Sequence, residues 1–419
     1  MQQKMQQTSW SKVIILGGLS SIIFVLMVIA THNFLTEPFP GHNDFLSRWE
    51  GARSFWVDGL NPYGEEASLN IQTMMWGRPS LPDEDQVLFA YPMYTAILIA
   101  PLVWVNYAWA SAIMMVIMEA MMLIALFMLF DLFDWRPKVG TLALLALIAL
   151  FHYAPSRGLI LGQLGLVSYF MYVVTFWGLK REQDWVAGVA LSIATIKPQL
   201  GFLIVPFLLL WGLRVKRWHF VGSFTICIGI LVGASFLLVP TWLFDMWQQV
   251  TAYTGYAPPI PSDVLFGEVI GISTDFKYIL FAALWLMMLI GWYQVLVQNR
   301  QERAMWVAMI TLAVSNIASP VIATPHFTVF MIPLIFYLKH LSRRPKNRKW
   351  ALVLLLVVMI EPWIRFFLTL DYETTLESWV MAYPEPIVVL LSLWFTRQLW
   401  WEKGNLLQPV NHQKTAITR

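Results

Sequence analysis

Charged residues are scarce in this sequence. Lys, Arg, Asp and Glu together make up 13% of the 419 residues, about half of the ~25% that is typical of soluble globular domains. Hydrophobic residues reach 58%, and the mean hydropathy is +0.61. This balance excludes an ordinary soluble globular protein. The formal net charge of +3 is too small to favour binding to nucleic acid, and we predict no nucleic-acid partner.

Cysteine is almost absent, and groups that bind metals are sparse. Cys227 is the single cysteine and lies in an apolar run, so that a disulfide within the chain is excluded. The 7 histidines are scattered, and no pair of carboxylates stands at helical spacing from a histidine. Because a metal site needs several such ligands at close spacing, we predict no metal and no cofactor.

Long apolar runs, in contrast, are abundant. Runs of about 19 apolar residues, the length needed to cross a bilayer as a helix, recur along the chain. The 22 tryptophans suit a protein with two membrane interfaces. The first run, 13–31, lacks a small-residue cleavage site, so we interpret it as an uncleaved anchor. The sequence therefore predicts an all-α polytopic membrane protein with a single domain over 1–419.

Basic residues indicate which side of the membrane each connector faces. They gather before the first run and in three later connectors: Lys4 and Lys12, 214–217, 300–303, and 339–349. Cytoplasmic connectors carry an excess of Lys and Arg. We therefore predict a multi-pass plasma-membrane protein with its N-terminus and these connectors in the cytoplasm. The two large extracytoplasmic loops are then 32–92 and 241–275.

The number of crossings follows from the positions of the two termini. Arg397 and Lys403 favour a cytoplasmic C-terminus, whereas about thirteen runs would leave the termini on opposite sides. One neighbouring pair of runs must then cross only once. The candidates are 91–131, interrupted at Pro101, and 185–213, interrupted at Lys197. We favour the first, which gives about twelve transmembrane helices.

The loop at 32–92 is the only long, strongly acidic polar segment, with nine acidic residues against three basic ones. Apolar residues recur in it at helical spacing, namely Phe45, Trp49, Ala52 and Trp56. This pattern predicts a short amphipathic helix on the membrane surface, ended by Gly59 and the turn at 61–62.

If this topology holds, ionisable and polar side chains gather at helix ends on the outer side. They are Asp44, Arg48, Arg53, Tyr91, Arg157, Gln163, Lys197 and His326. An ionisable group within membrane-embedded sequence costs roughly 2.5–3.5 kcal/mol, so such a group usually has a function. Lys197 has apolar runs on both sides and is the strongest single candidate.

Each candidate also has a structural alternative. Asp44 can be an N-cap of the surface helix, Lys197 can extend its ammonium to the membrane interface, and His326 can cap the next span. The aromatic residues of 241–275 are interface anchors or platforms for sugar rings. They are Trp242, Trp247, Tyr253 and Tyr256.

One exposed carboxylate, several cations and a membrane together favour glycosyl transfer from a lipid-phosphate sugar. A carboxylate can act as general base toward an acceptor hydroxyl, an effect worth roughly 10²–10⁴-fold. The leaving phosphate needs preorganised positive charge and hydrogen-bond donors rather than a second carboxylic acid.

Two other classes of function stay open. One is a secondary transporter, which usually carries internal repeats and polar residues near the bilayer midplane; the other is a non-catalytic membrane lipid-binding protein.

At these residues the sequence resembles glycosyltransferase family 87, membrane enzymes of the GT-C fold related to polyprenol-phosphate-mannose-dependent mannosyltransferases. The similarity covers residues 10–340. It rests on short elements in this order: NDF at 43–45, AR at 52–53, DGLNPY at 58–63, FAYP at 89–92, PL at 101–102, LGQ at 161–163, KPQ at 197–199, SP at 319–320, and His326.

The resemblance implies a GT-C-type helical bundle with the activity of a hexosyltransferase, and mannose is the expected sugar. It also implies a polyprenyl-phosphate sugar donor held among membrane lipids, a glycolipid or glycan acceptor on the extracytoplasmic side, and no nucleotide-sugar site. Asp44 matches the first-loop aspartate expected to act as general base with inversion at the anomeric carbon, and His326 matches the histidine near the donor phosphate. The other residues that we expect to bind the donor are Lys197, Arg53, Arg48, Tyr91, Gln163 and Arg157.

Overall fold

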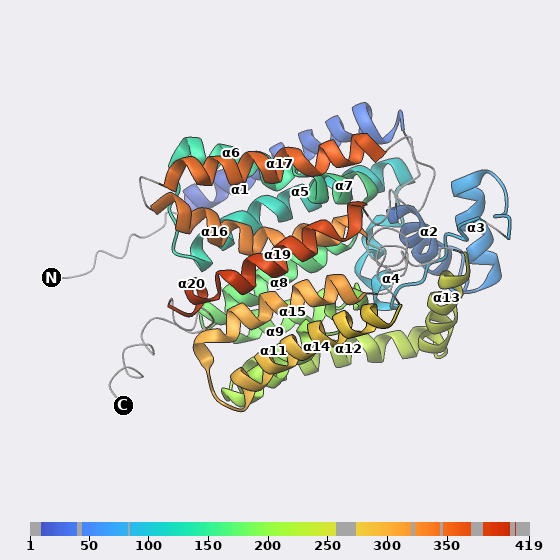
Figure 1. Ribbon diagram of the computed structural model, residues 1–419. Coiled ribbons are helices and arrows are strands. Elements are labelled where there is room, and N and C mark those ends of the chain that lie inside the picture. Colours follow the sequence, from blue (N-terminus) through green and yellow to red (C-terminus); the bar gives the residue numbers. More distant parts are fainter. Residues whose placement is uncertain are drawn as a thin grey trace.

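The computed structural model describes residues 10–39, 44–82, 84–256, 274–319, 323–343, 347–369, 380–402 and 407. Every regular element in these residues is helical, which confirms the all-α prediction. Figure 1 shows the long helices lying side by side along one direction, so that the molecule is a bundle with two ends. At one end lie α2 (Asp44–Trp56), α3 (Glu65–Trp76) and α13 (Trp242–Tyr256), and α20 (Arg397–Trp401) lies at the other.

Five helices of the described residues are long and apolar enough to cross a membrane. They lie in α1 (Trp10–Thr31) continued by η1 (His32–Thr36), and in α5 (Tyr107–Leu132), α12 (Trp218–Leu238), α14 (Thr274–Leu296) and α17 (Arg348–Thr369). A sixth span forms if α6 (Val139–Phe151) and α7 (Tyr153–Leu161), which are bent by 50° where they meet, count as one. The prediction of a membrane-embedded chain is therefore confirmed.

Shorter helices complete the bundle, and several of them form its interior. They are α8 (Gly165–Lys180), α9 (Asp184–Ala194), α10 (Pro198–Gly201), α11 (Ile204–Arg214), η4 (Gln301–Arg303), α15 (Ala304–Ala318), η5 (Thr324–Phe330), α16 (Met331–Arg343) and α19 (Pro384–Phe395). Nearly the whole length of α15 is buried, and α9 packs against both α8 and α12. The long helices α12 and α14 instead expose apolar side chains such as Ile230 and Leu286. Apolar surface of this kind suits contact with lipid.

The stretch 91–131 contains one long helix rather than two. Its first part forms only α4 (Tyr94–Leu98) and η2 (Ala100–Leu102), whereas α5 has 26 residues. Asn106 begins α5, because its side chain accepts a hydrogen bond from the backbone N–H of Trp109 at 3.1 Å. In this stretch α5 alone is long enough to cross a membrane, and the count of about twelve crossings stays a prediction.

The helix expected near Phe45 is present as α2, and its apolar stripe packs against the bundle. Phe45 and Trp49 are buried, and their rings contact that of Tyr107 at the start of α5. The Trp49 indole N–H donates to the Leu102 carbonyl at 2.8 Å. Gly59 follows the helix with a left-handed φ of +70°, as expected for a residue that ends it. Because protein covers this stripe, α2 is held rigidly over one end of the bundle.

The two loops predicted on the same side of the membrane contact each other. The Gln249 side chain of α13 accepts a hydrogen bond from the Ala90 backbone N–H at 2.8 Å and donates to the Tyr63 carbonyl at 3.0 Å. The Asn61 amide donates to the Asp245 carboxylate at 3.1 Å. Segments far apart in the sequence thus form one polar layer at the α2 end of the bundle.

An ion pair closes the part of the first loop that follows α3. Arg78 binds the Glu84 carboxylate at 2.7 Å. Hydrogen bonds from Arg78, and then from the Leu81 backbone N–H, lower the pKa of Glu84 to about 2. The carboxylate is therefore ionised over the whole physiological range, and its contribution to loop stability disappears only as the pH falls toward about 2.

Candidate active site

Lys197 is a buried cation next to α2. It lies between α9 and α10, where Pro198 starts a new helical turn. Only 2% of its surface is exposed, so its ammonium does not extend to an interface and that alternative is wrong. The ammonium donates to the Gln163 side-chain oxygen and lies near the side chain of Tyr91. Asp44 and Arg48 lie close enough to interact with its charge.

Gln163 reaches Lys197 because of the turn that ends α7. Gly162 has a left-handed φ of +63°, and the Gln163 backbone N–H donates back to the Gly158 carbonyl at 2.9 Å. This is the hydrogen-bond pattern with which glycine commonly ends a helix. The turn fixes the point at which the Gln163 side chain leaves the backbone.

We expect Gly162→Ala to destabilise the protein and to lower its activity. An added Cβ would lie 2.5 Å from the Cβ of Phe45, the residue after Asp44. Overpacking and left-handed strain together cost about 2–5 kcal/mol. The measurement is the unfolding temperature of the purified protein in detergent.

Gly77→Ala is the matched control for this steric effect. Gly77 also has a left-handed φ, of +70°, but no atom lies within 4 Å of an added Cβ. Gly77→Ala should therefore introduce the left-handed backbone strain without a steric clash. Its unfolding temperature should fall by less than that of Gly162→Ala. Equal drops in both variants would contradict a close contact between the Gly162 turn and the start of α2.

Asp44, Arg48 and Tyr91 form the side of the cluster that belongs to the first loop. Asp44 is the first residue of α2 and is partly buried. At this position its carboxylate interacts favourably with the helix dipole. The Arg48 guanidinium donates to the Asp44 backbone carbonyl at 2.9 Å and lies 4.3 Å from the centre of the Tyr91 ring. Tyr91 therefore links Arg48 to Lys197.

His326 approaches the same lysine from η5. Its side chain is 2% exposed and lies close enough to interact with the charge of Lys197. Gly165, at the start of α8, provides the space, since an added Cβ there would lie 3.4 Å from the His326 ring and 3.7 Å from the Lys197 side chain. The Nε2 atom of His326 has no hydrogen-bond partner among the described residues. A buried polar atom of this kind can bond to a ligand, as a donor when Nε2 carries the proton.

Two expected donor-binding residues have other contacts. Arg53 binds the Asp58 carboxylate at 3.0 Å and the Glu50 carboxylate at 3.5 Å. The Arg157 guanidinium lies over the Phe366 ring, 5.4 Å from its centre. No described contact joins either arginine to Lys197. The cluster thus contains Asp44, Arg48, Tyr91, Gln163, Lys197 and His326.

A mostly apolar pocket of about 380 Å³ lies beside η5 and was not predicted. Phe327 and Phe330, which follow His326 in the sequence, line it together with side chains of α16, α17 and α19. His152, whose ring nitrogens have no partner among the described residues, also lines it. Each contributing helix has ordinary apolar sequence, so no local pattern in the sequence marks this pocket.

In the described residues no three or more His, Cys, Asp or Glu side chains come close enough to hold a metal ion. The cluster around Lys197 is instead suited to an anion next to a carboxylate, because cations and hydrogen-bond donors stabilise developing phosphate charge. The chemistry that this arrangement can perform is proton removal by Asp44 within reach of an anion held by Lys197.

A protein-family model, described as glycosyltransferase family 87, matches residues 89–362, which is well over half of the chain. The matched part contains Tyr91, Gln163, Lys197 and His326. Asp44 precedes it. No curated protein matches the chain.

Proposed function

The chain belongs to glycosyltransferase family 87 and is therefore a membrane glycosyltransferase, and from this premise we propose that it transfers a hexose, with mannose expected, from a polyprenyl-phosphate donor to an extracytoplasmic glycolipid or glycan. The observation that carries the proposal is the cluster around Lys197. Asp44 from the first loop and His326 from η5 each lie close enough to Lys197 to interact with its charge. The grouping supports transfer of a sugar from a lipid phosphate, which needs a base for the acceptor and positive charge for the leaving phosphate.

In the proposed step Asp44 takes the proton of the acceptor hydroxyl, whose oxygen bonds to the anomeric carbon of the donor. The bond between that carbon and the phosphate oxygen breaks, and its electron pair leaves with the polyprenyl phosphate. Attack from the face opposite the phosphate inverts the anomeric configuration. The general base contributes roughly 10²–10⁴-fold to the rate. The departing phosphate needs no carboxylic acid partner, in contrast to glycoside hydrolysis.

Lys197 and His326 are the proposed phosphate ligands. A lysine ammonium has three hydrogen-bond donors, and Gln163 accepts one of them through its side-chain oxygen. The remaining donors are the ones proposed for a phosphate oxygen. The Nε2 atom of His326 supplies a second buried donor. Arg48, fixed over the Tyr91 ring, adds positive charge nearby.

The pocket beside η5 is the proposed site for the first part of the polyprenyl chain. It begins next to His326, because Phe327 and Phe330 of the same short helix line it. Its other walls are mostly apolar side chains of α16, α17 and α19, with Glu361, Arg365 and Glu385 also on the lining. A polyprenyl tail that enters this pocket would keep its phosphate next to Lys197 while the rest of the chain lies in lipid.

We expect Val357→Trp to raise the KM for a long-chain donor about tenfold, because the indole would fill part of this pocket and cost about 1.4 kcal/mol of donor binding. The kcat should be nearly unchanged. With a donor whose lipid has only two isoprene units, the KM of this variant should equal that of the wild type. The measurement is initial-rate kinetics with donors of both lengths.

Val353→Trp is the matched control, since Val353 lies one turn earlier on α17, is similarly exposed and does not line the pocket. It should have wild-type kinetics with both donors. If Val357→Trp and Val353→Trp change the KM equally, or if the short donor is affected as strongly as the long one, the lipid chain lies elsewhere.

The proposed orientation places the Lys197 cluster on the extracytoplasmic side of the plasma membrane and both termini in the cytoplasm, with about twelve crossings. The acidic first loop and α13 gather at the end of the bundle that carries α2. The connectors rich in Lys and Arg, such as 214–217 and 300–303, join helices whose other ends lead toward that layer. The positive-inside bias supports this orientation.

The direct test is transfer by the purified protein in proteoliposomes. We expect radiolabelled mannose to move from polyprenyl-phosphate mannose to a lipid or glycan acceptor, and no transfer from a nucleotide sugar. Uptake of a solute without any sugar-lipid product would instead favour a secondary transporter. Absence of product with every polyprenyl-phosphate sugar would overturn the proposed donor.

A further inference from the structure

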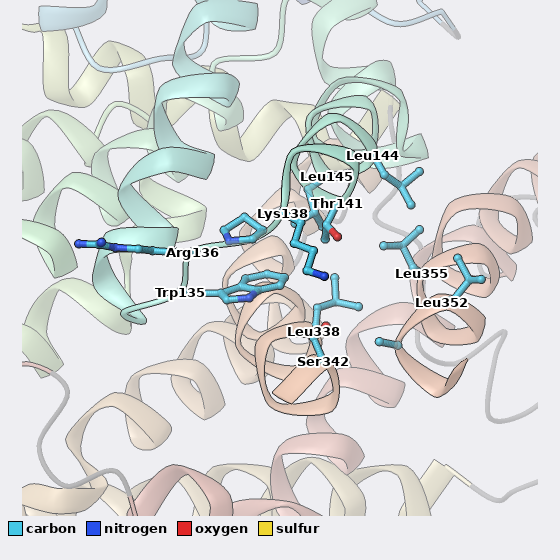
Figure 2. A pocket seen from close by; sticks show the side chains of 12 residues that line it. Trp135, Arg136, Lys138, Thr141, Leu144, Leu145, Leu338, Ser342, Leu352 and Leu355 are labelled. Atoms are coloured by element: carbon cyan, nitrogen blue, oxygen red, sulfur yellow. The ribbon is translucent and has the colours of Figure 1, made fainter. Parts of the chain in front are cut away.

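A second pocket lies at the end of the bundle away from Asp44. Its volume is about 350 Å³, and its lining includes Trp135, Lys138, Thr141, Leu338, Ser342 and Leu355 (Figure 2). The distance to the Lys197 cluster follows from α5. This helix starts at Tyr107, which contacts Phe45, and ends at Leu132, about 38 Å further along its axis. The pocket, which we name the basic-end pocket, is therefore separate from the proposed active site.

The basic-end pocket has an apolar wall and a polar mouth. Leucine side chains from α6, α16 and α17 form the wall. Figure 2 shows the Lys138 side chain extending toward Leu338, with Trp135 on one side and Leu355 on the other, whereas Arg136 points away. Lys138 is therefore the cation of the pocket, and the hydroxyls of Thr141 and Ser342 lie on the same lining.

The polar groups of this pocket have no partners in the described part of the chain. The side chains of Lys138, Thr141 and Ser342 make neither a hydrogen bond nor an ion pair with those residues. The nearby carboxylates are occupied, since Asp131 binds Arg181 and Asp134 binds Lys180. A cation and two hydroxyls are thus left for an external ligand with negative charge.

The position of the pocket along the spans indicates where that ligand comes from. The candidate span in α5 ends at Leu132, and that in α17 begins at Lys349. Trp135 and Lys138 therefore lie just outside the apolar layer, while Leu355 lies within it. Tryptophan is enriched at this depth. A phospholipid has its phosphate at the same depth and its acyl chains in the apolar layer.

We propose that the basic-end pocket binds an anionic phospholipid, with its phosphate on Lys138, Thr141 and Ser342 and an acyl chain along the leucine wall. Basic pockets between transmembrane helices bind anionic head groups in this way. The segment 339–349, which follows the Leu338 side of the pocket in the sequence, contains six Lys or Arg and no acidic residue. This excess of positive charge disfavours a zwitterionic head group with its own cation. A volume of about 350 Å³ suits part of such a lipid.

The experiment titrates the purified protein in detergent with palmitoyl-oleoyl phosphatidylglycerol and follows its unfolding temperature, because a ligand of the folded state stabilises it by mass action. The wild type should be stabilised saturably. In Lys138→Ala the apparent affinity should fall about fivefold. Lys138→Arg should keep most of it. Lys216→Ala, which removes an exposed charge outside the pocket, should respond as the wild type does.

Three results would overturn the proposal. In the first, Lys138→Ala and Lys216→Ala lose the same affinity, so that only general surface charge matters. In the second, phosphatidylcholine stabilises the wild type as strongly as phosphatidylglycerol. In the third, inorganic phosphate alone produces the full shift, which would make the ligand a soluble anion. None of these readouts depends on sugar transfer, so they are independent of the proposed function.

Discussion

Asp44→Asn should abolish sugar transfer while the protein remains folded, present in the membrane and able to bind its donor. Asparagine has nearly the same shape as aspartate but cannot take a proton from the acceptor hydroxyl. Loss of a general base costs roughly 10²–10⁴-fold in rate. The measurement is the initial rate of transfer from polyprenyl-phosphate mannose, together with donor binding and the amount of protein in the membrane.

Asp58→Asn is the matched control for this substitution. Asp58 lies in the same loop, just after α2, and pairs with Arg53 at 3.0 Å. The ion pair is partly exposed, so its loss should cost less than about 1 kcal/mol. Transfer should remain within a few-fold of wild type. If Asp44→Asn is as active as Asp58→Asn, then Asp44 is not the base.

Lys197→Met should abolish donor binding and turnover together. Methionine keeps the length and apolar stem of lysine but removes the buried charge that we propose to hold the departing phosphate. Loss of one preorganised group of this kind costs roughly 10²–10³-fold in rate. The measurement is kcat, KM and direct binding of polyprenyl-phosphate mannose, each related to the amount of folded protein.

Lys180→Met is the matched control, because it removes a buried lysine that lies outside the proposed active site. Lys180 is 9% exposed, pairs with Asp134 at 2.8 Å and donates to the Leu132 carbonyl at 2.7 Å. This variant should unfold at a lower temperature but keep wild-type turnover per folded molecule. Should Lys197→Met show the same pattern, with normal kinetics and reduced stability, Lys197 is a structural residue only.

Much of the Lys197 cluster could be predicted from the sequence because charge in apolar surroundings is rare and costly. Lys197 stands between two apolar runs, and its burial is what that position leads one to expect. The helix that begins at Asp44 followed from apolar spacing, whereas the left-handed turn at Gly162, which ends α7 before Gln163, was not predicted. The contacts between these segments were then suggested by topology, since all of them were placed at the same side.

Contacts between side chains could not be predicted in the same way. Arg53 and Arg157 have the same charge as Lys197, but Arg53 pairs with Asp58 and Arg157 lies over Phe366. Nothing in their local sequence distinguishes these roles. The stripe of α2 is amphipathic whether lipid or protein covers it, and only the packing on Tyr107 decides between the two. Both pockets lie between helices that are distant in sequence. The spacing of apolar residues along one helix does not predict such gaps.

We propose that the donor phosphate lies on Lys197 and His326 with the anomeric carbon facing Asp44. A cryo-electron microscopy structure of the full chain with a non-transferable polyprenyl-phosphonate sugar bound tests it most directly. We expect phosphonate density in contact with Lys197 and His326, sugar density beside Asp44, and lipid density along Phe327 and Phe330. Sugar density outside this cluster, with Asp44 remote from the anomeric carbon, would contradict it.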